Sequence, residues 1–173
     1  MQTSYTSSRE VQVHRLHPLV LLGVPLVAVF LQAYLPLLVP AFAILDLPLL
    51  VTIFFAVARR NPIGGLLTGG IIGLLQDSLT NKLIGLYGIA KTVIGYLASS
   101  IGVKVDVENP GSRFLMTFAF YILHRLIYQL VARGLANQTM QLRWHHDLLL
   151  GAVINAVLAI PLFAMLDRFK RPA

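Results

Sequence analysis

The 173-residue sequence has no cysteine, few charged residues and a single tryptophan. The absence of cysteine excludes a disulfide framework, thiolate metal sites and cysteine nucleophiles. Charged residues make up only 12% of the chain and hydrophobic residues 57%, whereas soluble proteins carry about 25% charged residues. The mean hydropathy is +0.75. A soluble protein of this length could not cover so apolar an interior with so few charged side chains. The composition therefore predicts a membrane protein and argues against a soluble enzyme.

Six hydrophobic segments are candidates for membrane-spanning helices, because about 20 apolar residues are needed to cross the hydrocarbon core of a bilayer. Four of these segments are long: 18–38, 83–101, 114–131 and 148–166. Two are shorter, 47–58 and 62–75, and the turn Arg59-Arg60-Asn61-Pro62 between them is typical of a hairpin. The predicted fold is all-α, a single polytopic bundle of six transmembrane helices. Its predicted parts are an N-terminal tail 1–17, the bundle 18–167 and a basic C-terminal tail 168–173.

The chain has 14 Lys and Arg but only 7 Asp and Glu. In a membrane protein such an excess of basic residues sets the orientation and attracts anionic lipid headgroups, so we expect no nucleic-acid partner. With six spans, most bases fall on the side of the N-terminus: Arg9, Arg15, Arg59, Arg60, Lys104, Arg113, Arg168, Lys170 and Arg171. The opposite side holds only Lys82, Arg133 and Arg143. This distribution predicts a multi-pass protein of the cytoplasmic (inner) membrane with both termini in the cytoplasm. The first segment is too long for a cleaved signal peptide, so we expect it to be retained.

Small residues form strips on two successive segments. Gly65, Gly69 and Gly73 recur every four residues and share a helix face, and Gly88 and Gly95 lie on a similar strip of the next segment. Such strips allow membrane helices to approach closely. We expect these two helices to pack against each other within the chain, with self-association into a homodimer as the alternative.

Two basic residues, Lys91 and Arg125, lie inside predicted spans, where ionisable groups are costly and often functional. Three carboxylates fall near outer helix ends, which gives a candidate intramembrane polar cluster or partner interface of Asp46, Asp77, Lys91, Arg125 and Asp147. We hypothesise that Lys91 or Arg125 pairs with one of these carboxylates. Asp77 is the first candidate, because it ends a helix that we expect to pack against that of Lys91. In the alternative, Asp77 meets Lys82 and the basic side chains snorkel outward.

Other polar residues have local structural explanations. Asp46, followed by Pro48, is typical of a helix start, and the amide of Asn155 is predicted to bond to another helix. His124 is read as a packed polar residue. The adjacent His145 and His146 would point in different directions on a helix, and no second pair completes a metal site. With no Walker loop or nucleophile elbow in the sequence, we expect no catalytic residues, no metal and no cofactor.

The segment 46–102 contains a series of short motifs whose order and spacing are similar to those of a known protein family. These are Asp46-Leu47-Pro48, Arg59-Arg60-Asn61-Pro62, the glycines Gly65, Gly69 and Gly73, Gln76-Asp77, Gly85-Leu86-Tyr87-Gly88 and Gly95-Tyr96-Leu97. In these motifs the sequence resembles the family of the bacterial rod shape-determining protein MreD. The rest of the chain agrees in length, number of spans and basic C-terminal end. The resemblance assigns no role to Lys91 or Arg125.

The resemblance implies a non-enzymatic scaffold of the cell-elongation machinery, involved in cell shape and lateral peptidoglycan synthesis. The implied partners are a bitopic MreC-like protein and, through it, RodA, a class B penicillin-binding protein and MreB, besides membrane lipids. The family's six-helix arrangement also resembles the substrate-binding membrane subunits of energy-coupling-factor transporters. A vitamin-binding transporter subunit is therefore the alternative, with a pocket lined by Tyr87, Tyr96, Tyr121 and Tyr128. A third hypothesis is an intramembrane enzyme or ion pathway that uses Lys91, His124 and Arg125.

Overall fold

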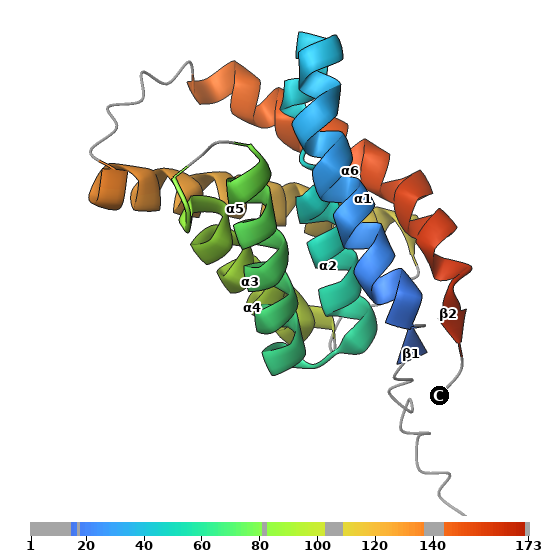
Figure 1. Ribbon diagram of the computed structural model, residues 1–173. Helices are drawn as coiled ribbons and strands as arrows, with labels where there is room; N and C mark the ends of the chain where they lie inside the picture. The colour runs from blue at the N-terminus through green and yellow to red at the C-terminus, as the bar shows by residue number, and fades with distance from the viewer. Residues whose placement is uncertain (1–14, 17, 81–82, 103–108, 137–143, 172–173) are drawn as a thin grey trace, which may run out of the picture.

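The structure, a computed structural model, describes residues 15–16, 18–80, 83–102, 109–136 and 144–171. Within them lie six α-helices and one short 3-10 helix, η1. The bounds are α1 Pro18–Leu38, η1 Pro40–Ile44, α2 Leu47–Arg59, α3 Pro62–Leu79, α4 Leu86–Gly102, α5 Pro110–Ala136 and α6 Trp144–Asp167. Two strands of two residues each, β1 Arg15–Leu16 and β2 Lys170–Arg171, pair antiparallel. Both described ends of the chain therefore lie at one end of the molecule (Figure 1).

All six predicted helices are present, and the predicted bounds of α1 are confirmed. Among the described residues, four segments are long and apolar enough to cross a membrane: Leu19–Leu38, Pro40–Arg59, Pro110–Leu135 and Asp147–Asp167. The segment 83–101, predicted as a long span, is not among these four. Its helix, α4, begins only at Leu86 and has 17 residues, a length of about 26 Å. The segment 40–59 qualifies instead, because η1 lengthens the apolar stretch that precedes α2.

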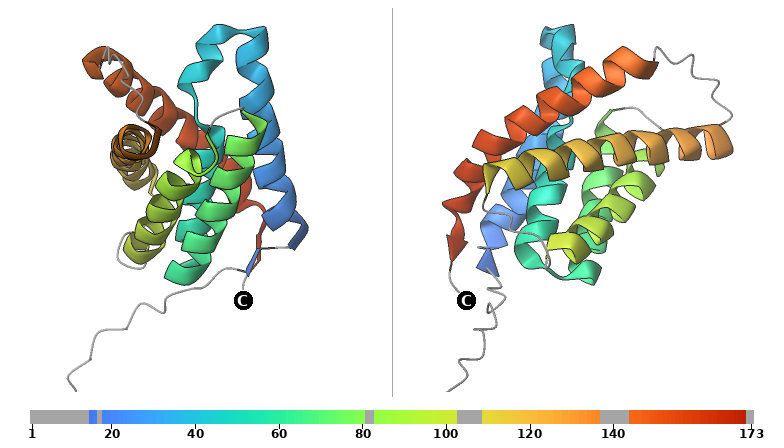
Figure 2. Two further views of the ribbon diagram at one scale, coloured as in Figure 1. Left: turned by 60° about the vertical axis from the view of Figure 1, so that its left-hand side comes forward. Right: turned by 180° about the vertical axis from the view of Figure 1, so that it is seen from behind.

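The helices are arranged in two groups. α1 to α4 run roughly side by side, whereas α5 crosses them steeply and α6 runs obliquely past α1 and α2 (Figures 1 and 2). The hairpin between α2 and α3 lies at the same end as β1 and β2 (Figure 1). α1 and η1 extend beyond α2 at the opposite end, so α2 begins inside the bundle rather than at its edge (Figures 1 and 2).

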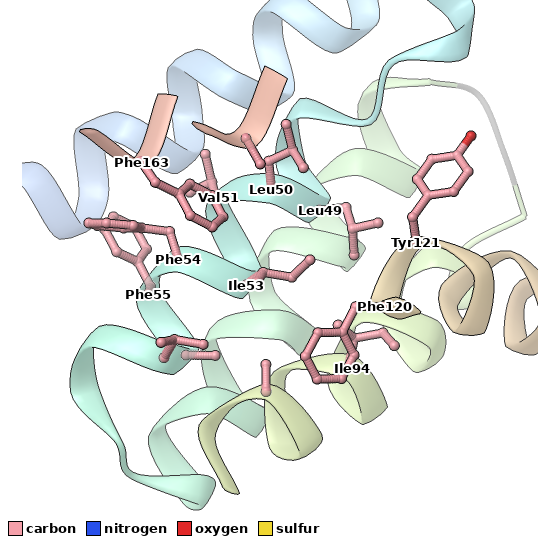
Figure 3. Packing of buried hydrophobic residues seen from close by; sticks show 14 of the residues in the cluster. Leu49, Leu50, Val51, Ile53, Phe54, Phe55, Ile94, Phe120, Tyr121 and Phe163 are labelled. Atoms are coloured by element: carbon pink, nitrogen blue, oxygen red, sulfur yellow. The ribbon is translucent and has the colours of Figure 1, made fainter. Parts of the chain in front are cut away.

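α2 is the central helix, and all of its residues from Pro48 to Ala58 are buried. Its apolar side chains pack against Ile94 of α4, Phe120 of α5 and Phe163 of α6 (Figure 3). Asp46 caps the helix, since its carboxylate accepts the N–H of Leu49 at 3.0 Å. The prediction of a helix start at Asp46 is therefore confirmed. A helix apolar on every side suits this interior position.

α3 and α4 are in backbone contact along their glycine strips. The residues at this contact include Gly65, Gly69, Gly73, Gly88 and Gly95. A Cβ atom added to Gly69 would lie 2.7 Å from the backbone carbonyl carbon of Lys91, and one added to Gly73 would lie 2.7 Å from the Cα of Gly88. Such distances are shorter than real side-chain contacts, so glycine is required for this approach. The two strips face each other within the chain, which leaves these glycine faces covered.

Candidate functional site

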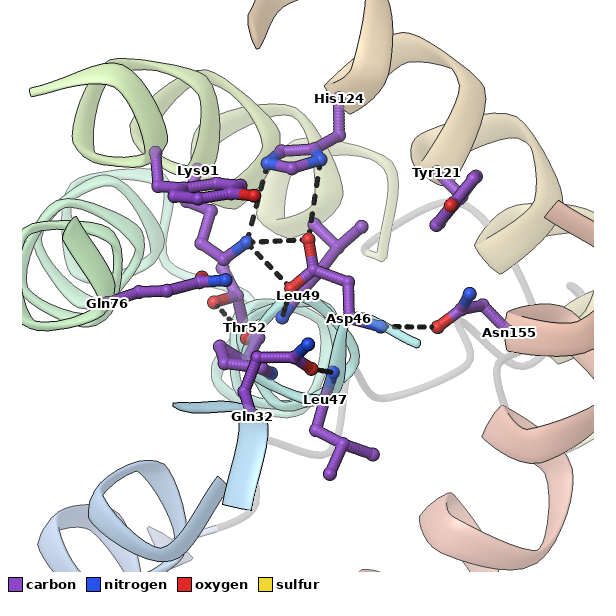
Figure 4. A network of polar contacts seen from close by, with 12 residues as sticks. Gln32, Asp46, Leu47, Leu49, Thr52, Gln76, Lys91, Tyr121, His124 and Asn155 are labelled. Carbon is purple, nitrogen blue, oxygen red and sulfur yellow. Dashed lines mark hydrogen bonds and ion pairs between the residues drawn. The ribbon is translucent and has the colours of Figure 1, made fainter. Parts of the chain in front are cut away.

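A buried ion pair lies at the start of α2. The Nζ atom of Lys91 is 2.9 Å and 3.1 Å from the two carboxylate oxygens of Asp46 (Figure 4). Lys91 is 0% exposed and Asp46 is 7% exposed. The hypothesis that a basic residue inside a span pairs with a carboxylate is confirmed for Lys91, but the partner is Asp46 and not Asp77. Snorkelling of Lys91 is excluded, because its side chain stays inside the bundle.

His124 of α5 and Tyr87 of α4 contact the ion pair, and Tyr128 of α5 packs behind Tyr87. The Nε2 atom of His124 is 3.4 Å from Lys91 Nζ, and its Nδ1 atom is 3.6 Å from Asp46 Oδ2. The His124 ring stacks on Tyr87, which in turn packs against Tyr128 at a centroid distance of 4.6 Å. Lys91 Nζ lies 4.9 Å from the Tyr87 ring centroid, an arrangement that favours the cation electrostatically. Of the four tyrosines expected to line a ligand pocket, Tyr87 and Tyr128 pack against each other, whereas Tyr96 is exposed and the Tyr121 hydroxyl donates to the carbonyl of Ile44.

Side chains from α1 and α6 bind the backbone at the same helix start. The Oδ1 atom of Asn155 accepts the N–H of Asp46 at 2.9 Å, and its Nδ2 atom donates to the carbonyl of Ile44 at 2.9 Å. From α1, Gln32 Oε1 accepts the N–H of Leu47 at 3.0 Å. Backbone N–H groups at a helix start have no partner within the helix, so these contacts satisfy groups that would otherwise be buried unpaired. The predicted interhelical hydrogen bond of Asn155 is confirmed.

The ion pair and these hydrogen bonds together form what we call the α2 hub: Gln32, Asp46, Lys91, His124 and Asn155 (Figure 4). Each residue comes from a different part of the fold, namely α1, the cap of α2, α4, α5 and α6. Sequence reasoning assigned no role to Gln32 and no partner to His124. The available signal was a polar side chain inside a long apolar segment, alone in the case of Gln32 and beside Arg125 in the case of His124.

Asp77 has a separate role at the turn between α3 and α4. Its carboxylate accepts the N–H groups of Gly85, Tyr87 and Gly88 at 2.9, 3.0 and 3.0 Å. Gly85 has a φ of 105°, a conformation that favours glycine. Asp77 therefore binds the start of α4 through backbone groups. The alternative partner, Lys82, lies outside the described residues.

The other two residues of the predicted polar cluster, Arg125 and Asp147, are not part of the α2 hub. Arg125 is half-buried on α5 and forms no ion pair with any described residue. Asp147 is exposed in the first turn of α6. The side chains of His145 and His146 lie outside the described part of the structure.

The chemistry of the hub is that of a fixed ion pair. Asp46 uses its carboxylate for Lys91 and for the N–H of Leu49, and Lys91 is held between that carboxylate and an aromatic ring. Within the described ranges, no group of three His, Cys, Asp or Glu side chains could hold a metal ion. Removal of one partner from a buried pair leaves an uncompensated charge, which is costly. The ion pair therefore holds the start of α2 against α4.

Comparison with known families decides the affiliation of the chain. The family model described as rod shape-determining protein MreD matches residues 14–169, nearly the whole chain and every residue of the α2 hub. The chain belongs to the MreD family. A search of curated proteins and a search of solved structures gave no significant match. Membership in the MreD family makes the protein a rod shape-determining membrane protein, and that family is structural and not a known enzyme family.

Proposed function

We propose that this MreD-family protein is a non-enzymatic scaffold of the cell-elongation machinery in the cytoplasmic (inner) membrane. It would contribute to cell shape and lateral peptidoglycan synthesis by binding a bitopic MreC-like protein. Through that partner it would act with RodA, a class B penicillin-binding protein and MreB. The observation that carries the proposal is the family match over residues 14–169.

The proposed topology has six spans within 18–167 and two cytoplasmic tails, 1–17 and 168–173. The pairing of β1 with β2 supports it, because it brings the two ends of the bundle together. The turn between α2 and α3, with Arg59 and Arg60, lies at the same end (Figure 1). Basic residues concentrate on the cytoplasmic side of membrane proteins, so this end is the one we assign to the cytoplasm. We also propose that the arrangement resembles the substrate-binding subunits of energy-coupling-factor transporters.

The proposed role of the α2 hub is to hold the helices in register while partners bind elsewhere. Lys91 and His124 are each 0% exposed, so a partner helix cannot reach them without opening the bundle. The glycine strips of α3 and α4 are likewise covered by each other. A partner helix is therefore expected on the apolar outer faces of the bundle, such as that of α6, where Leu149, Val153 and Val157 are exposed.

Affinity purification of the tagged full-length chain from its native membrane, followed by mass spectrometry of proteins and small molecules, tests this function. We expect an MreC-like protein together with RodA and a class B penicillin-binding protein. Recovery of an ATPase module with a bound vitamin would overturn the scaffold and favour the transporter alternative. An unrelated multi-pass protein with the same tag, purified in parallel, controls for nonspecific capture.

A further inference from the structure

An apolar groove with a volume of about 300 Å³ lies between α1 and α3. One wall is α1 from Leu21 to Leu26, and the other is α3 from Gly64 to Leu75. Arg59, the last residue of α2, lines the end of the groove at the α2–α3 hairpin. Because Leu22, Leu67 and Ile71 are exposed, the groove opens on the outer surface of the bundle.

The length of the groove matches one leaflet of a bilayer. At about 1.5 Å per residue, the α3 wall from Gly64 to Leu75 is about 16 Å long. That is about half of the 30 Å thickness of the hydrocarbon core. The α1 wall also lies in the half of α1 that is nearer the hairpin. A transmembrane partner helix would need a surface across both leaflets, whereas an acyl chain needs a surface in only one.

The end of the groove at the hairpin carries positive charge. Arg59 is half-buried, and none of the described carboxylates lies within 4.0 Å of its guanidinium group. Its Cζ atom is 3.9 Å from the position that a Cβ on Gly64 would occupy, at the groove wall. Arg60 follows directly in the chain, and the N-terminus of α3 adds the positive end of a helix dipole. A guanidinium group is well suited to bind a phosphate through two hydrogen bonds.

We propose that this groove binds one phospholipid with an anionic headgroup, with an acyl chain between α1 and α3 and the phosphate on Arg59. A second groove, between α4 and α5, provides an internal comparison. It has a volume of about 410 Å³, and the described residues that line it include no charged side chain. It should accept acyl chains without a preference for headgroup charge.

Tryptophan quenching by brominated lipids tests the proposal at the groove itself. Trp144 is the single tryptophan of the chain, so Trp144→Phe combined with Leu22→Trp gives one reporter on the α1 wall. The protein is reconstituted in vesicles of phosphatidylcholine and phosphatidylglycerol, and either lipid is brominated in turn. We expect brominated phosphatidylglycerol to be preferred about fivefold over brominated phosphatidylcholine as a quencher of this reporter. That is the preference for an anionic lipid that one basic residue near the membrane surface provides. Arg59→Gln should remove this preference.

Two controls separate the groove from the general charge of the protein. A reporter at Leu115→Trp, also in the Trp144→Phe background, lines the uncharged groove and is 67% exposed, as Leu22 is. It should show no headgroup preference. Arg168→Gln removes an exposed base outside the groove and should leave the preference at the Leu22→Trp reporter unchanged.

Salt gives a further measurement that needs no change at Arg59. Raising the salt concentration from 0.1 M to 1 M should reduce the preference at the Leu22→Trp reporter, because ions screen the attraction. Equal quenching by the two brominated lipids would overturn the proposal. So would a preference that survives in Arg59→Gln protein whose circular dichroism is native, or one that is equally strong at both reporters.

Discussion

Loss of one partner from the buried Lys91–Asp46 pair is expected to destabilise the bundle more than loss of both. Lys91→Met leaves the carboxylate without its cation, and Asp46→Asn leaves the ammonium group without its anion. The double variant leaves neither charge behind. Asparagine is as good a helix cap as aspartate, so Asp46→Asn keeps the capping bond to Leu49 and tests the charge alone.

The structure sets the expected size of the effect. The two groups are 2.9 Å apart, and the Lys91 side chain is fully buried. Removal of one partner from such a pair costs about 3–5 kcal/mol in the free energy of unfolding. Two independent losses would add up to about 6–10 kcal/mol. Because replacement of both partners by neutral groups is often nearly free, we expect the double variant to lose less than about 3 kcal/mol.

Equilibrium unfolding in mixed micelles, with increasing fractions of dodecyl sulfate and circular dichroism as the signal, measures these free energies. A matched cycle combines Lys91→Met with Asp147→Asn, because Asp147 is exposed and forms no ion pair with Lys91 among the described residues. That cycle should be additive within about 0.5 kcal/mol. If the Lys91 and Asp46 effects also simply add, the pair is not coupled and the reasoning is refuted.

Two further changes test the packing and the α2 hub by the same unfolding measurement. Gly69→Leu should cost at least about 2 kcal/mol, because its side chain would enter the backbone of α4. Gly23→Leu, at a glycine with no atom within 4 Å of an added Cβ, is the control, and equal losses in both variants would contradict the close contact. Asn155→Leu should cost about 1–3 kcal/mol, since it leaves the buried Asp46 N–H unpaired and leaves the Ile44 carbonyl with only the longer bond from the Tyr121 hydroxyl, at 3.4 Å. Native stability in Asn155→Leu would show that water replaces those bonds.

Much of the helical architecture was predictable because its signals are local. The bounds of α1 follow from one long, mainly apolar segment. The starts of α2 and α3 follow from Asp46 and Asn61, whose side chains bond to N–H groups three residues ahead. The family resemblance could also be recognised, since it depends on the order of motifs along the chain. These features need no knowledge of how distant helices meet.

The partner of Lys91 was not predictable in this way. Asp46 was expected near an outer helix end, but α2 is shorter than α1, with 13 residues against 21. At about 1.5 Å per residue the difference is about 12 Å, so the start of α2 lies well inside the bundle. η1 returns the chain to that depth and brings Asp46 to Lys91, 45 residues away in the sequence. Asp77, although on the neighbouring helix, has its carboxylate occupied by backbone N–H groups of the next turn.

The sequence by itself determined the membrane class, the six helices, the cap of α2 and the MreD family, because hydrophobic segments, turn residues and motif order act over short stretches of chain. Only the tertiary structure decided which carboxylate meets Lys91, how the glycine strips are covered and where a charged groove opens on the surface. The physical reason is that these features depend on the depth and the crossing of helices far apart in the chain. A shift of one helical turn, about 5.4 Å, would break an ion pair of 2.9 Å without any change in the local sequence signals.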